Sequence, residues 1–360
     1  MSVFPTDTRL MLVHTTDPAE PPGGRAMLSQ FNARLLSELY GDGFVDHRLP
    51  VRGGTARGIL RGHVDGVDGA SIVTLLTRIA AERISTVFLD GSNLGAAAAS
   101  IRRVYPTVRI VTFFHNVEAR FFQGALRERR SMRGLAVLVA NFVAERQAVR
   151  ASDVLIALSA RDSAGLLRLY GRAADAVAPI VLNDTFVESA TSADVKTPYA
   201  LFVGGGFYAN IAGIDWFARV IAPRIALPVM VVGRGMDVLA PCFATNDQVT
   251  LVGRVDNLAP WYAGAALVIA PIFDGSGMKT KVAEALMHGK RVVGTAEAFS
   301  GYAEDIVAAN ARCDSADAFV TALQAPPPPA FDPAMRALYE RDHSPTAARA
   351  RLARILGIVT

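Results

Sequence analysis

The sequence contains little cysteine and no long hydrophobic run, and both absences restrict the class of protein. Only two of its 360 residues are cysteines, Cys242 and Cys313, and they stand far apart without a CxxC pair. A disulfide framework or a zinc site is therefore not expected, whereas a reducing cytoplasm fits. The longest apolar run, Gly134–Ala144, is shorter than the roughly 20 residues that span a bilayer, and the N-terminus does not resemble a signal peptide. We expect a cytoplasmic protein that at most lies on a membrane surface.

The motifs of several common enzyme classes are also missing. No G-x-G-x-x-G follows the first predicted strand, which argues against a dehydrogenase. Neither G-x-S-x-G nor H-E-x-x-H occurs, so serine hydrolases and zinc proteases lose support. We expect no bound metal, and no nucleic-acid partner because no signature of a nucleic-acid-binding fold is present.

Lysine is rare as well, since only four of the 37 basic residues are lysines. Three of them, Lys279, Lys281 and Lys290, lie within twelve positions. The formal net charge is +4, yet residues 101–150 hold ten arginines against three glutamates. This local excess favours an anionic partner. The segment Arg120–Arg133 mixes arginines with Phe121, Phe122 and Leu126, which suits an interfacial helix on anionic lipid, although a solvated basic helix face fits equally well.

Short β-branched runs alternate with amphipathic helical patterns along the chain, which predicts an α/β fold. A polar segment, Asn183–Pro198, breaks the alternation. We expect two doubly wound, Rossmann-like domains whose parallel sheets face a crevice. The first comprises residues 1–185 and a closing helix at 334–360, the second comprises 199–325, and 186–198 form the linker. Ligands of such sheets bind beyond the carboxyl ends of the strands.

The individual elements follow from the same patterns. Strands are expected at Leu10–His14, Thr86–Asp90, Ile110–His115, Val154–Ser159, Ala200–Gly204, Val229–Gly233, Val249–Val252, Leu267–Ala270 and Arg291–Thr295. Long helices are expected at Leu28–Tyr40, Ile72–Arg83, Ala119–Arg150 and Ala334–Leu356.

The segment Ala270–Thr295 carries the strongest functional signal. A predicted strand ends at Pro271, a loop with Gly275 and Gly277 follows, and a helix is expected to begin near Lys281. Glycines allow backbone N–H groups to approach an anion, and the helix N-terminus adds partial positive charge. In a chain that otherwise uses arginine, lysines at 279 and 281 favour a diphosphate site over an ordinary turn with solvated lysines.

Glu284 lies one helical turn further on, where a carboxylate can accept two ribose hydroxyls. A glutamate that simply balances the helix dipole and a nearby lysine is an equally common arrangement. Two further glycine loops follow predicted strands: Gly204–Gly206, with Asn210 after it, and Pro22–Arg25. Both would allow close backbone approach to a ligand, but glycine-rich turns are frequent.

His115 ends a predicted strand in the segment HNVE, so its ring is expected to open into the crevice. There it can hydrogen-bond a substrate. The alternative is a purely structural role, with Asn116 as the N-cap of the next helix.

The order of several segments resembles bacterial glycosyltransferases of the GT-B fold, in particular the large retaining family 4, or group 1. These segments are PPGGR, HNVE, ERQAVRASDVLIALSARD, VGGGFYANIAGIDWF, VTLVGRVDNLAPWYAGAALVIAPIF and GSGMKTKVAEALMHGKRVVGT. The similarity covers most of the chain and is most specific over Ala200–Gly301. In this family the C-terminal domain binds a nucleotide sugar and the N-terminal domain receives the acceptor.

The resemblance implies roles for single residues. His115 matches a histidine that contacts the donor sugar, and Glu284 matches the carboxylate that binds the ribose. His115, Lys279 and Glu284 are the implied catalytic residues. The implied donor-binding residues are Gly23, Gly24, Gly205, Gly206, Asn210, Arg254, Val255, Asp274, Gly275, Ser276, Gly277, Met278, Lys279, Thr280, Lys281 and Glu284.

Two features depart from the family pattern. Ser276 stands where a sugar-contacting glutamate is common, and Asp274 or the Gly-Ser-Gly backbone are the candidates to replace it. The Arg and Lys pair usual after the first strand of the second domain is absent from GGGFYANIAG, so Lys279 and Lys281 are expected to supply its charge.

The implied reaction is transfer of a sugar from a nucleoside diphosphate sugar, UDP being favoured, to an acceptor hydroxyl. Retention of configuration is expected, without a metal or other cofactor. The acceptor is expected to be a glycan, a lipid-linked molecule or a small molecule in exopolysaccharide or lipopolysaccharide assembly. Two alternatives stay open: a nucleotide-sugar epimerase of the same fold, and a non-catalytic partner subunit. The serine at 276, in place of the common glutamate, favours the second of these.

Overall fold

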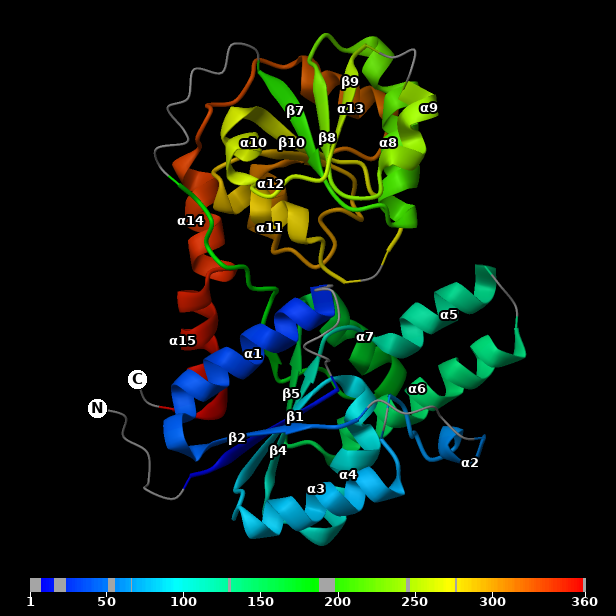
Figure 1. The fold of residues 1–360 in the computed structure, drawn as a ribbon, viewed down its shortest axis with the longest axis vertical. Coiled ribbons are helices and arrows are strands. Elements are labelled where there is room, and N and C mark those ends of the chain that lie inside the picture. The colour runs from blue at the N-terminus through cyan, green and yellow to red at the C-terminus, as the bar shows by residue number, and fades with distance from the viewer. Residues whose placement is uncertain are drawn as a thin grey trace. The chain divides into compact units, whose positions relative to one another are not determined.

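The computed structural model describes residues 8–15, 24–50, 56–65, 67–128, 131–187, 198–243, 247–275 and 277–358. By its internal contacts the chain divides into two compact units, Met1–Pro179 with Arg349–Thr360, and Ile180–Ala348. Each unit contains one six-stranded sheet with helices around it (Figure 1). The expected α/β fold with two doubly wound parallel sheets is thus confirmed. The exact domain boundaries expected from the sequence remain a prediction, and most of the linker lies outside the described residues.

In the first unit, every neighbouring pair of strands is parallel, and the strand order is β2–β1–β3–β4–β5–β6. The strands are β1 (Leu10–His14), β2 (Phe44–Arg48), β3 (Thr86–Asp90), β4 (Arg109–Phe114), β5 (Val154–Ala157) and β6 (Ala176–Val177). The order reverses between β1 and β3, because β2 adds to one side of β1 and all later strands add to the other. Open α/β sheets bind ligands at such a switch point.

Helices pack on both faces of this sheet (Figure 1). They are α1 (Gly24–Tyr40), α2 (Ala56–Ile59), α3 (Gly69–Ala81), α4 (Gly95–Val104), α5 (Glu118–Glu128), α6 (Met132–Ala151) and α7 (Ala160–Tyr170). Strand β3 is buried along its whole length, and its Val87 and Leu89 belong to one core cluster with Leu75 of α3 and Ile101 of α4. Continuous apolar strands of this kind are typical of parallel sheets that are covered on both faces.

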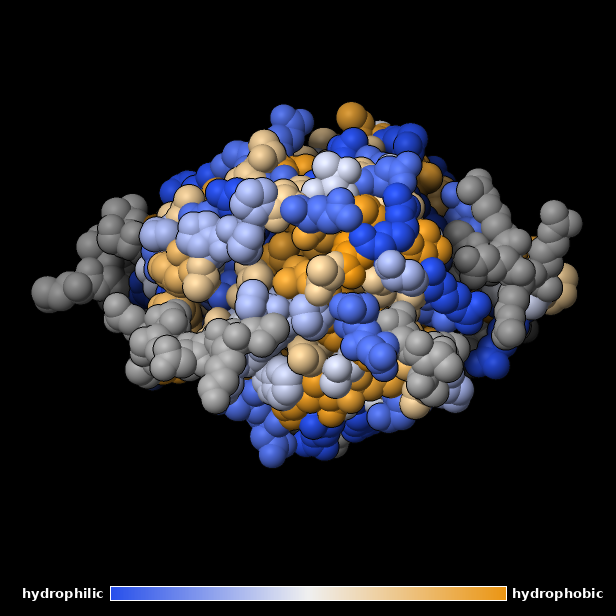
Figure 2. Space-filling model, turned by 90° about the horizontal axis from the view of Figure 1, so that it is seen from above, coloured by the Kyte–Doolittle hydropathy of each residue, from blue (hydrophilic) through white to orange (hydrophobic). Residues whose placement is uncertain are grey.

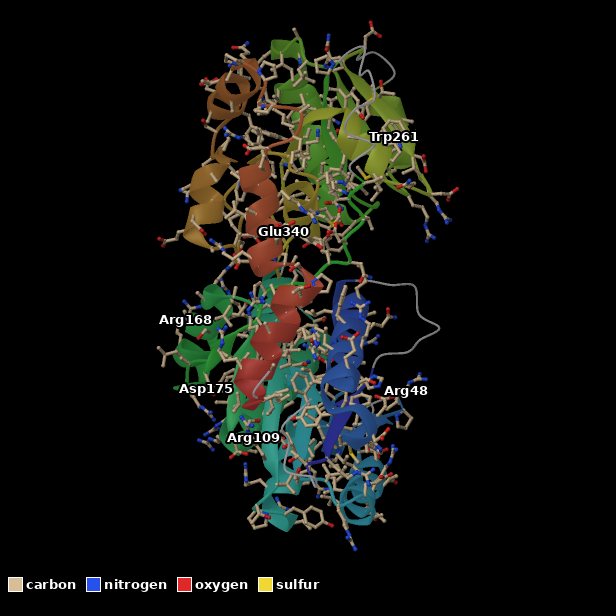
Figure 3. All side chains as sticks on the ribbon, turned by 90° about the vertical axis from the view of Figure 1, so that its left-hand side faces the viewer. Arg48, Arg109, Arg168, Asp175, Trp261 and Glu340 are labelled. Carbon is tan, nitrogen blue, oxygen red and sulfur yellow. The ribbon has the colours of Figure 1, made fainter. Side chains whose placement is uncertain are left out.

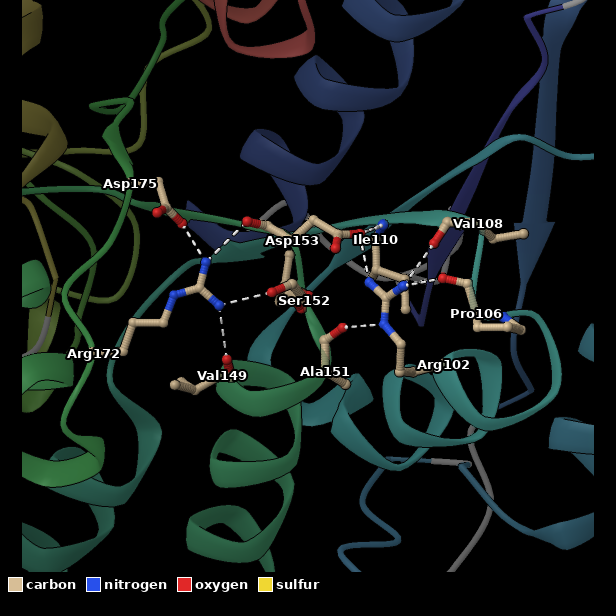
Figure 4. Close-up of polar contacts among 11 residues, drawn as sticks. Arg102, Pro106, Val108, Ile110, Val149, Ala151, Ser152, Asp153, Arg172 and Asp175 are labelled. Carbon is tan, nitrogen blue, oxygen red and sulfur yellow. Dashed lines mark hydrogen bonds and ion pairs between the residues drawn. The ribbon is translucent and has the colours of Figure 1, made fainter.

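Two arginines hold together the edge of this sheet at which β4 and β5 begin (Figure 4). Arg102 donates to three backbone oxygens and, at 2.5 Å, to the carboxylate of Asp153. The same carboxylate accepts from the backbone N–H of Ile110 at 2.7 Å. Arg172 donates to three further backbone oxygens and, at 2.8 Å, to Asp175. The edge of the sheet at which the strands begin is therefore stabilised by charge-assisted hydrogen bonds, which are stronger than hydrogen bonds between neutral groups.

The second unit repeats the architecture with the strand order β12–β11–β10–β7–β8–β9. Its strands are β7 (Tyr199–Val203), β8 (Val229–Val232), β9 (Val249–Gly253), β10 (Ala265–Ala270), β11 (Val292–Gly294) and β12 (Ala311–Arg312). Its helices are α8 (Tyr208–Val220), α9 (Ala240–Phe243), α10 (Ala259–Gly264), α11 (Thr280–Met287), α12 (Glu304–Ala309), α13 (Ala316–Gln324) and α14 (Pro333–Asp342). Here the order reverses between β7 and β10. Apolar residues reach the surface in patches bordered by hydrophilic ones (Figure 2), which is ordinary for a globular protein and marks no site by itself.

One of the expected long helices proves to be two. The helix expected at Ala119–Arg150 is interrupted at Ser131, whose side-chain oxygen accepts a hydrogen bond from the N–H of Gly134 at 2.9 Å. This is N-cap geometry, and it starts α6 as a separate helix.

The closing helix is likewise divided, into α14 and α15 (Pro345–Leu356). Pro345 lacks an N–H and disfavours helical backbone at Ser344, so the continuous helix expected at 334–356 cannot form. Within the first unit, the guanidinium of Arg109 donates to the backbone oxygens of Leu356 at 2.7 Å and Ile355 at 3.0 Å (Figure 3). These bonds satisfy carbonyls that the end of a helix leaves unpaired.

Three strands of the structure were not predicted from the sequence. β6 and β12 have two residues each, too few to show an alternation. β2 carries Asp46 and Arg48 on its exposed positions, and its charged residues concealed the short buried face.

Candidate functional site

The loop between β10 and α11 in the second unit carries two lysines, and the structure shows what holds the first of them. The Nζ of Lys279 donates to the backbone oxygen of Gly277 and to Oε1 of Glu297, both at 2.9 Å. The side chains of this ion pair are largely buried. The hydroxyl of Tyr302 donates to the backbone oxygen of Lys279 at 2.7 Å and accepts from the N–H of Ala283 at 3.0 Å. The lysine is therefore fixed directly before the first turn of α11.

Lys281 is almost completely buried in the first turn of α11. Its Nζ donates to Oδ1 of Asn210 at 2.7 Å and lies 4.3 Å from the ring centroid of Phe202, a cation–π distance. Burial lowers the pKa of Lys281 to about 7; the nearby Glu284 carboxyl opposes this shift and Lys279 adds to it. Asn210 in turn donates to the backbone oxygen of Gly205 at 2.8 Å. The loops after β7 and β10 are thus connected at the switch point of the sheet.

Glu284 lies in the next turn of α11, and a tyrosine hydroxyl holds its carboxylate in place. The hydroxyl of Tyr262 donates to Oε2 of Glu284 at 2.9 Å, and the Tyr262 ring stacks on His288 with centroids 4.5 Å apart. Burial raises the pKa of Glu284, while the bonds from Tyr262 and the charge of Lys281 act against that shift. A carboxylate that neighbours fix in this way is oriented before any ligand arrives.

The glycine loop after β7 approaches another backbone segment very closely. A Cβ on Gly206 would lie 2.2 Å from the backbone oxygen of Gly235, and one on Gly233 would lie 2.0 Å from that of Gly204. The N–H of Gly206 also donates to the backbone oxygen of Arg234 at 2.8 Å. A side chain at these positions would push the two loops apart, so glycine is required by packing within the unit. Gly205, by contrast, meets only the Arg234 oxygen, at 3.6 Å.

The remaining donor-site candidates of the second unit line the same loops. Asp274 accepts from the Tyr208 hydroxyl at 3.0 Å and from the N–H of Gly275 at 2.6 Å. Gly275 and Gly277 have φ angles of 131° and 69°, which other residues rarely adopt. Met278 is buried, Thr280 begins α11, and Arg254 and Val255 directly follow β9. Ser276 lies outside the described residues.

In the first unit, His115 directly follows β4 and lies in a buried polar cluster. Its Nε2 is 3.0 Å from Oδ1 of Asp90, which also accepts from Asn32 at 2.7 Å, while Ser29 donates to the other carboxylate oxygen. Burial alone would raise the pKa of Asp90, but His115, Ser29 and Asn32 together lower it to about 2. The Nδ1 of His115 is buried and has no hydrogen-bond partner among the described residues. Gly24 is the first residue of α1, and Gly23 lies outside the described residues.

Sequence reasoning missed four residues that hold these side chains: Glu297, Tyr302, Tyr262 and Phe202. Glu297 follows β11, so the rule that sites form at the carboxyl ends of strands could have found it. The other three reach the loop from distant positions of the chain and leave no local signal.

Two kinds of feature are absent from the described part of the chain. It contains no group of three or more His, Cys, Asp or Glu side chains arranged to hold a metal ion. It also contains no helix that is long and apolar enough to cross a membrane.

Comparison with known proteins points to one class of enzyme. Residues 197–325 match the family model described as Glycosyl transferases group 1. This segment contains both loops and α11. Comparison with curated protein sequences gives no match.

Solved structures are similar over nearly the whole chain. A sucrose-phosphate synthase from Thermosynechococcus elongatus gives a TM-score of 0.72 at 15% identity and covers 97% of this chain and 98% of its own. HepE from Anabaena, in complex with UDP and glucose, gives 0.65 at 13% identity over 97% and 99%. The lipopolysaccharide outer core galactosyltransferase WaaB gives 0.63 at 10% identity over 97% and 99%. At such identities the likeness shows the fold. Together with the family match over residues 197–325, it confirms the expected resemblance to group 1 glycosyltransferases of the GT-B fold, which are enzymes that transfer sugars.

Proposed function

We propose that the protein transfers a sugar from a nucleoside diphosphate sugar, preferably a UDP-sugar, to an acceptor hydroxyl, with retention and without a metal or other cofactor. The observation that carries the proposal is the arrangement at α11. Lys279 and Lys281 flank the start of the helix. Glu284 follows one turn later, and the Tyr262 hydroxyl holds its carboxylate in place. The structures of HepE with UDP and with UDP-glucose support the choice of nucleotide.

In the proposed reaction, the acceptor oxygen bonds to the anomeric carbon while the bond from that carbon to the diphosphate breaks. The leaving phosphate oxygen takes the acceptor proton on the same face of the sugar. The charge that develops on the diphosphate is stabilised by the N-terminus of α11 and by the two lysines. Glu284 accepts the ribose hydroxyls, with its carboxylate held by the Tyr262 hydroxyl.

We also propose that the reaction belongs to exopolysaccharide or lipopolysaccharide assembly at the cytoplasmic face of a membrane. The support is the basic stretch Arg120–Arg133, beside which Phe121, Met132 and Leu135 are exposed by 39%, 82% and 43%. Basic residues next to exposed apolar ones bind anionic lipid surfaces. Anionic vesicles should therefore sediment the protein, whereas neutral vesicles should not.

The test is a calorimetric titration with UDP, GDP, TDP and their sugars in the presence of a chelator. We expect UDP to bind and to be coupled to proton uptake, because the pKa of Lys281 is about 7 before a diphosphate arrives. Titrations in two buffers of different ionisation enthalpy measure this uptake. Glu284→Gln and Lys279→Met should each lower turnover by about 100-fold or more while circular dichroism stays unchanged.

Arg219→Ala is the matched control, since Arg219 pairs with Asp215 on the exposed surface of α8 and lies in neither loop. It should retain full turnover. Absence of binding by every nucleotide would overturn the proposal in favour of a non-catalytic partner subunit. Release of an altered sugar without an acceptor would favour the epimerase.

A further inference from the structure

Tyr262 of α10 lies along one face of α11 and contacts Glu284 within the helix and His288 at its end. The Tyr262 hydroxyl donates to Oε2 of Glu284 at 2.9 Å, and the Tyr262 ring stacks on the imidazole of His288. The two ring centroids are 4.5 Å apart, and the planes differ by 6°. Glu284 and His288 are four residues apart, which places them on the same face of a helix. The carboxylate and the imidazole are therefore connected through one tyrosine.

The Glu284 carboxylate keeps acceptor capacity for a ligand. An ionised carboxylate offers about four acceptor positions. The Tyr262 hydroxyl takes one of them, and the side chain of Thr280 takes another. The described residues leave the others to a ligand, and the two hydroxyls of a ribose would fill them. The bond from Tyr262 fixes one oxygen and so decides the direction in which these remaining positions point.

A second attraction acts on the same carboxylate. Burial raises the pKa of Glu284, and the positive charge of Lys281 acts against that shift. An ammonium is a stronger hydrogen-bond donor to a carboxylate than a neutral hydroxyl is. A carboxylate that turned toward Lys281 would leave the orientation that the Tyr262 hydroxyl sets. The hydroxyl must therefore stay where it is for Glu284 to stay oriented.

His288 limits the movement of the Tyr262 ring. It is 4% exposed, and its backbone N–H donates to the backbone oxygens of Glu284 and Ala285 at 3.2 and 3.1 Å. The ring of Phe186 meets the imidazole nearly edge-on, with centroids 6.2 Å apart and an angle of 64° between the planes. The imidazole thus has two aromatic neighbours and a fixed backbone.

Phe186 is itself held by residues that follow α11 in the chain. Its ring stacks on Phe331 with centroids 5.1 Å apart, and the guanidinium of Arg336 lies 5.1 Å from its centroid. Arg336 also donates to the backbone oxygen of Met287, the last residue of α11, at 2.8 Å and to Oδ1 of Asp184 at 2.9 Å. Chain segments from before and after α11 therefore support the imidazole.

Hydrogen bonding does not explain a histidine at this position. The Nε2 of His288 is buried and has no partner among the described residues. Burial lowers the pKa of His288 to about 4, so the ring is neutral at pH 7. A buried nitrogen without a partner lowers stability, and a leucine would avoid that cost. What an imidazole offers and a leucine does not is a flat face for the Tyr262 ring.

We propose that His288 is a positioning residue for ribose recognition. Its flat ring fixes the plane of Tyr262, and the Tyr262 hydroxyl thereby orients the Glu284 carboxylate toward the two ribose hydroxyls of the nucleotide. This inference rests on the proposed function and adds to it a residue that acts through Tyr262 without touching the nucleotide.

The experiment compares the binding of UDP and of 2′,3′-dideoxy-UDP, which lacks the ribose hydroxyls, by calorimetric titration of the full chain. We expect wild type to bind UDP at least about tenfold more tightly than the dideoxy nucleotide, and Glu284→Gln to lose most of this ratio. His288→Leu should lower the ratio by about threefold. His288→Phe, which restores a flat ring, should keep the wild-type ratio. The melting temperature of His288→Leu should not fall, because the substitution removes the unpartnered nitrogen.

Val320→Ala is the matched control, because Val320 is buried in α13 of the same unit, outside α10 and α11. It should lower the melting temperature and leave the ratio unchanged, which is the pattern that a purely structural role of His288 would give. If His288→Leu does not fold, His288→Met takes its place, since a methionine fills the space without a flat face.

The outcomes separate the inference from the proposed function. A wild-type protein that binds neither nucleotide, or binds both equally, contradicts the proposed role of Glu284 and with it the proposed function. A tenfold ratio in wild type that persists in the folded leucine or methionine variant contradicts the inference alone. The same holds if His288→Phe is folded and loses the ratio as His288→Leu does.

Discussion

The two edges of the sheet in the first unit carry similar polar side chains, but those side chains have different roles at each edge. At the edge where the strands begin, Arg102 and Arg172 donate to backbone oxygens and to Asp153 and Asp175 (Figure 4). At the edge where they end, polar side chains also contact one another, but they leave hydrogen-bonding capacity unused. The buried Nδ1 of His115 has no hydrogen-bond partner among the described residues, and Glu118, at the start of α5, lines a cavity of about 460 Å³.

This difference separates stability from function along a single sheet. A carboxylate that accepts from an arginine and a backbone N–H has little left to offer a ligand. A carboxylate that faces a cavity can bind a ligand, but the free-energy cost of its desolvation is not offset by hydrogen bonds until the ligand is bound. The same substitution at the two edges should therefore have different consequences.

The largest effect is expected for Asp90→Asn at the carboxyl edge. The variant breaks the buried pair with His115, and it can place its side-chain NH2 group against the NH2 group of Asn32, where two donors face one another. The free energy of unfolding should therefore fall by roughly 3–5 kcal/mol at pH 7. The native pKa of Asp90 is about 2, below its ordinary value near 3.8. The stabilisation is therefore present above about pH 4 and is lost as the pH falls toward 2.

Urea unfolding of wild type and Asp90→Asn at pH 7, 4 and 2.5 measures this. The difference between the two proteins should shrink steadily with falling pH. A difference below about 1 kcal/mol at pH 7 would mean that the buried pair is replaceable and that the two edges are alike.

An intermediate effect of opposite sign is expected at Glu145 of α6. Its carboxylate accepts from the N–H groups of Glu118 and Ala119 at 2.8 and 3.1 Å, and from the Tyr170 hydroxyl at 2.6 Å. Burial raises the pKa of Glu145 to about 7, although these hydrogen bonds act against the shift. Because the native pKa lies above the ordinary value of 4.5, the native state binds the proton more tightly. This contribution to stability is complete below pH 4.5 and is lost as the pH rises through 7.

The expected loss is roughly 3 kcal/mol between pH 4.5 and 8. Glu145→Gln, which does not titrate, should flatten that part of the stability profile. Tyr170→Phe is the matched variant: it removes a bond that favours the carboxylate, so it should raise the pKa of Glu145 further and steepen the profile. Identical profiles for wild type and Glu145→Gln would contradict the assignment.

Local chemistry decided how much of this could be predicted. The strands and the loop before α11 were predictable because β-branched runs, glycines and a rare cluster of lysines lie close together in the chain. The partners of the lysines were not, since Glu297 lies 18 residues beyond Lys279 and Asn210 lies 71 residues before Lys281. The cavity of the first unit was invisible for another reason. A helix face made of Ala136, Val137 and Ala140 has the same periodicity whether it covers a core or lines a cavity.

The smallest effect is expected for Asp153→Asn at the amino edge, the same chemical change as at Asp90. Asp153 and Arg102 are 43% and 31% exposed, so solvent screens their attraction. Arg102 keeps its three backbone acceptors, and an asparagine oxygen still accepts from the N–H of Ile110. The free energy of unfolding should therefore fall by only about 1 kcal/mol, with no pH dependence like that of Asp90→Asn. UDP binding should remain at the wild-type level, because the loops around α11 belong to the second unit, whereas Asp153 belongs to the first. A loss as large as that of Asp90→Asn, or weaker UDP binding, would show that the two edges do not differ in this way, and that the division between a stabilising edge and a binding edge does not hold.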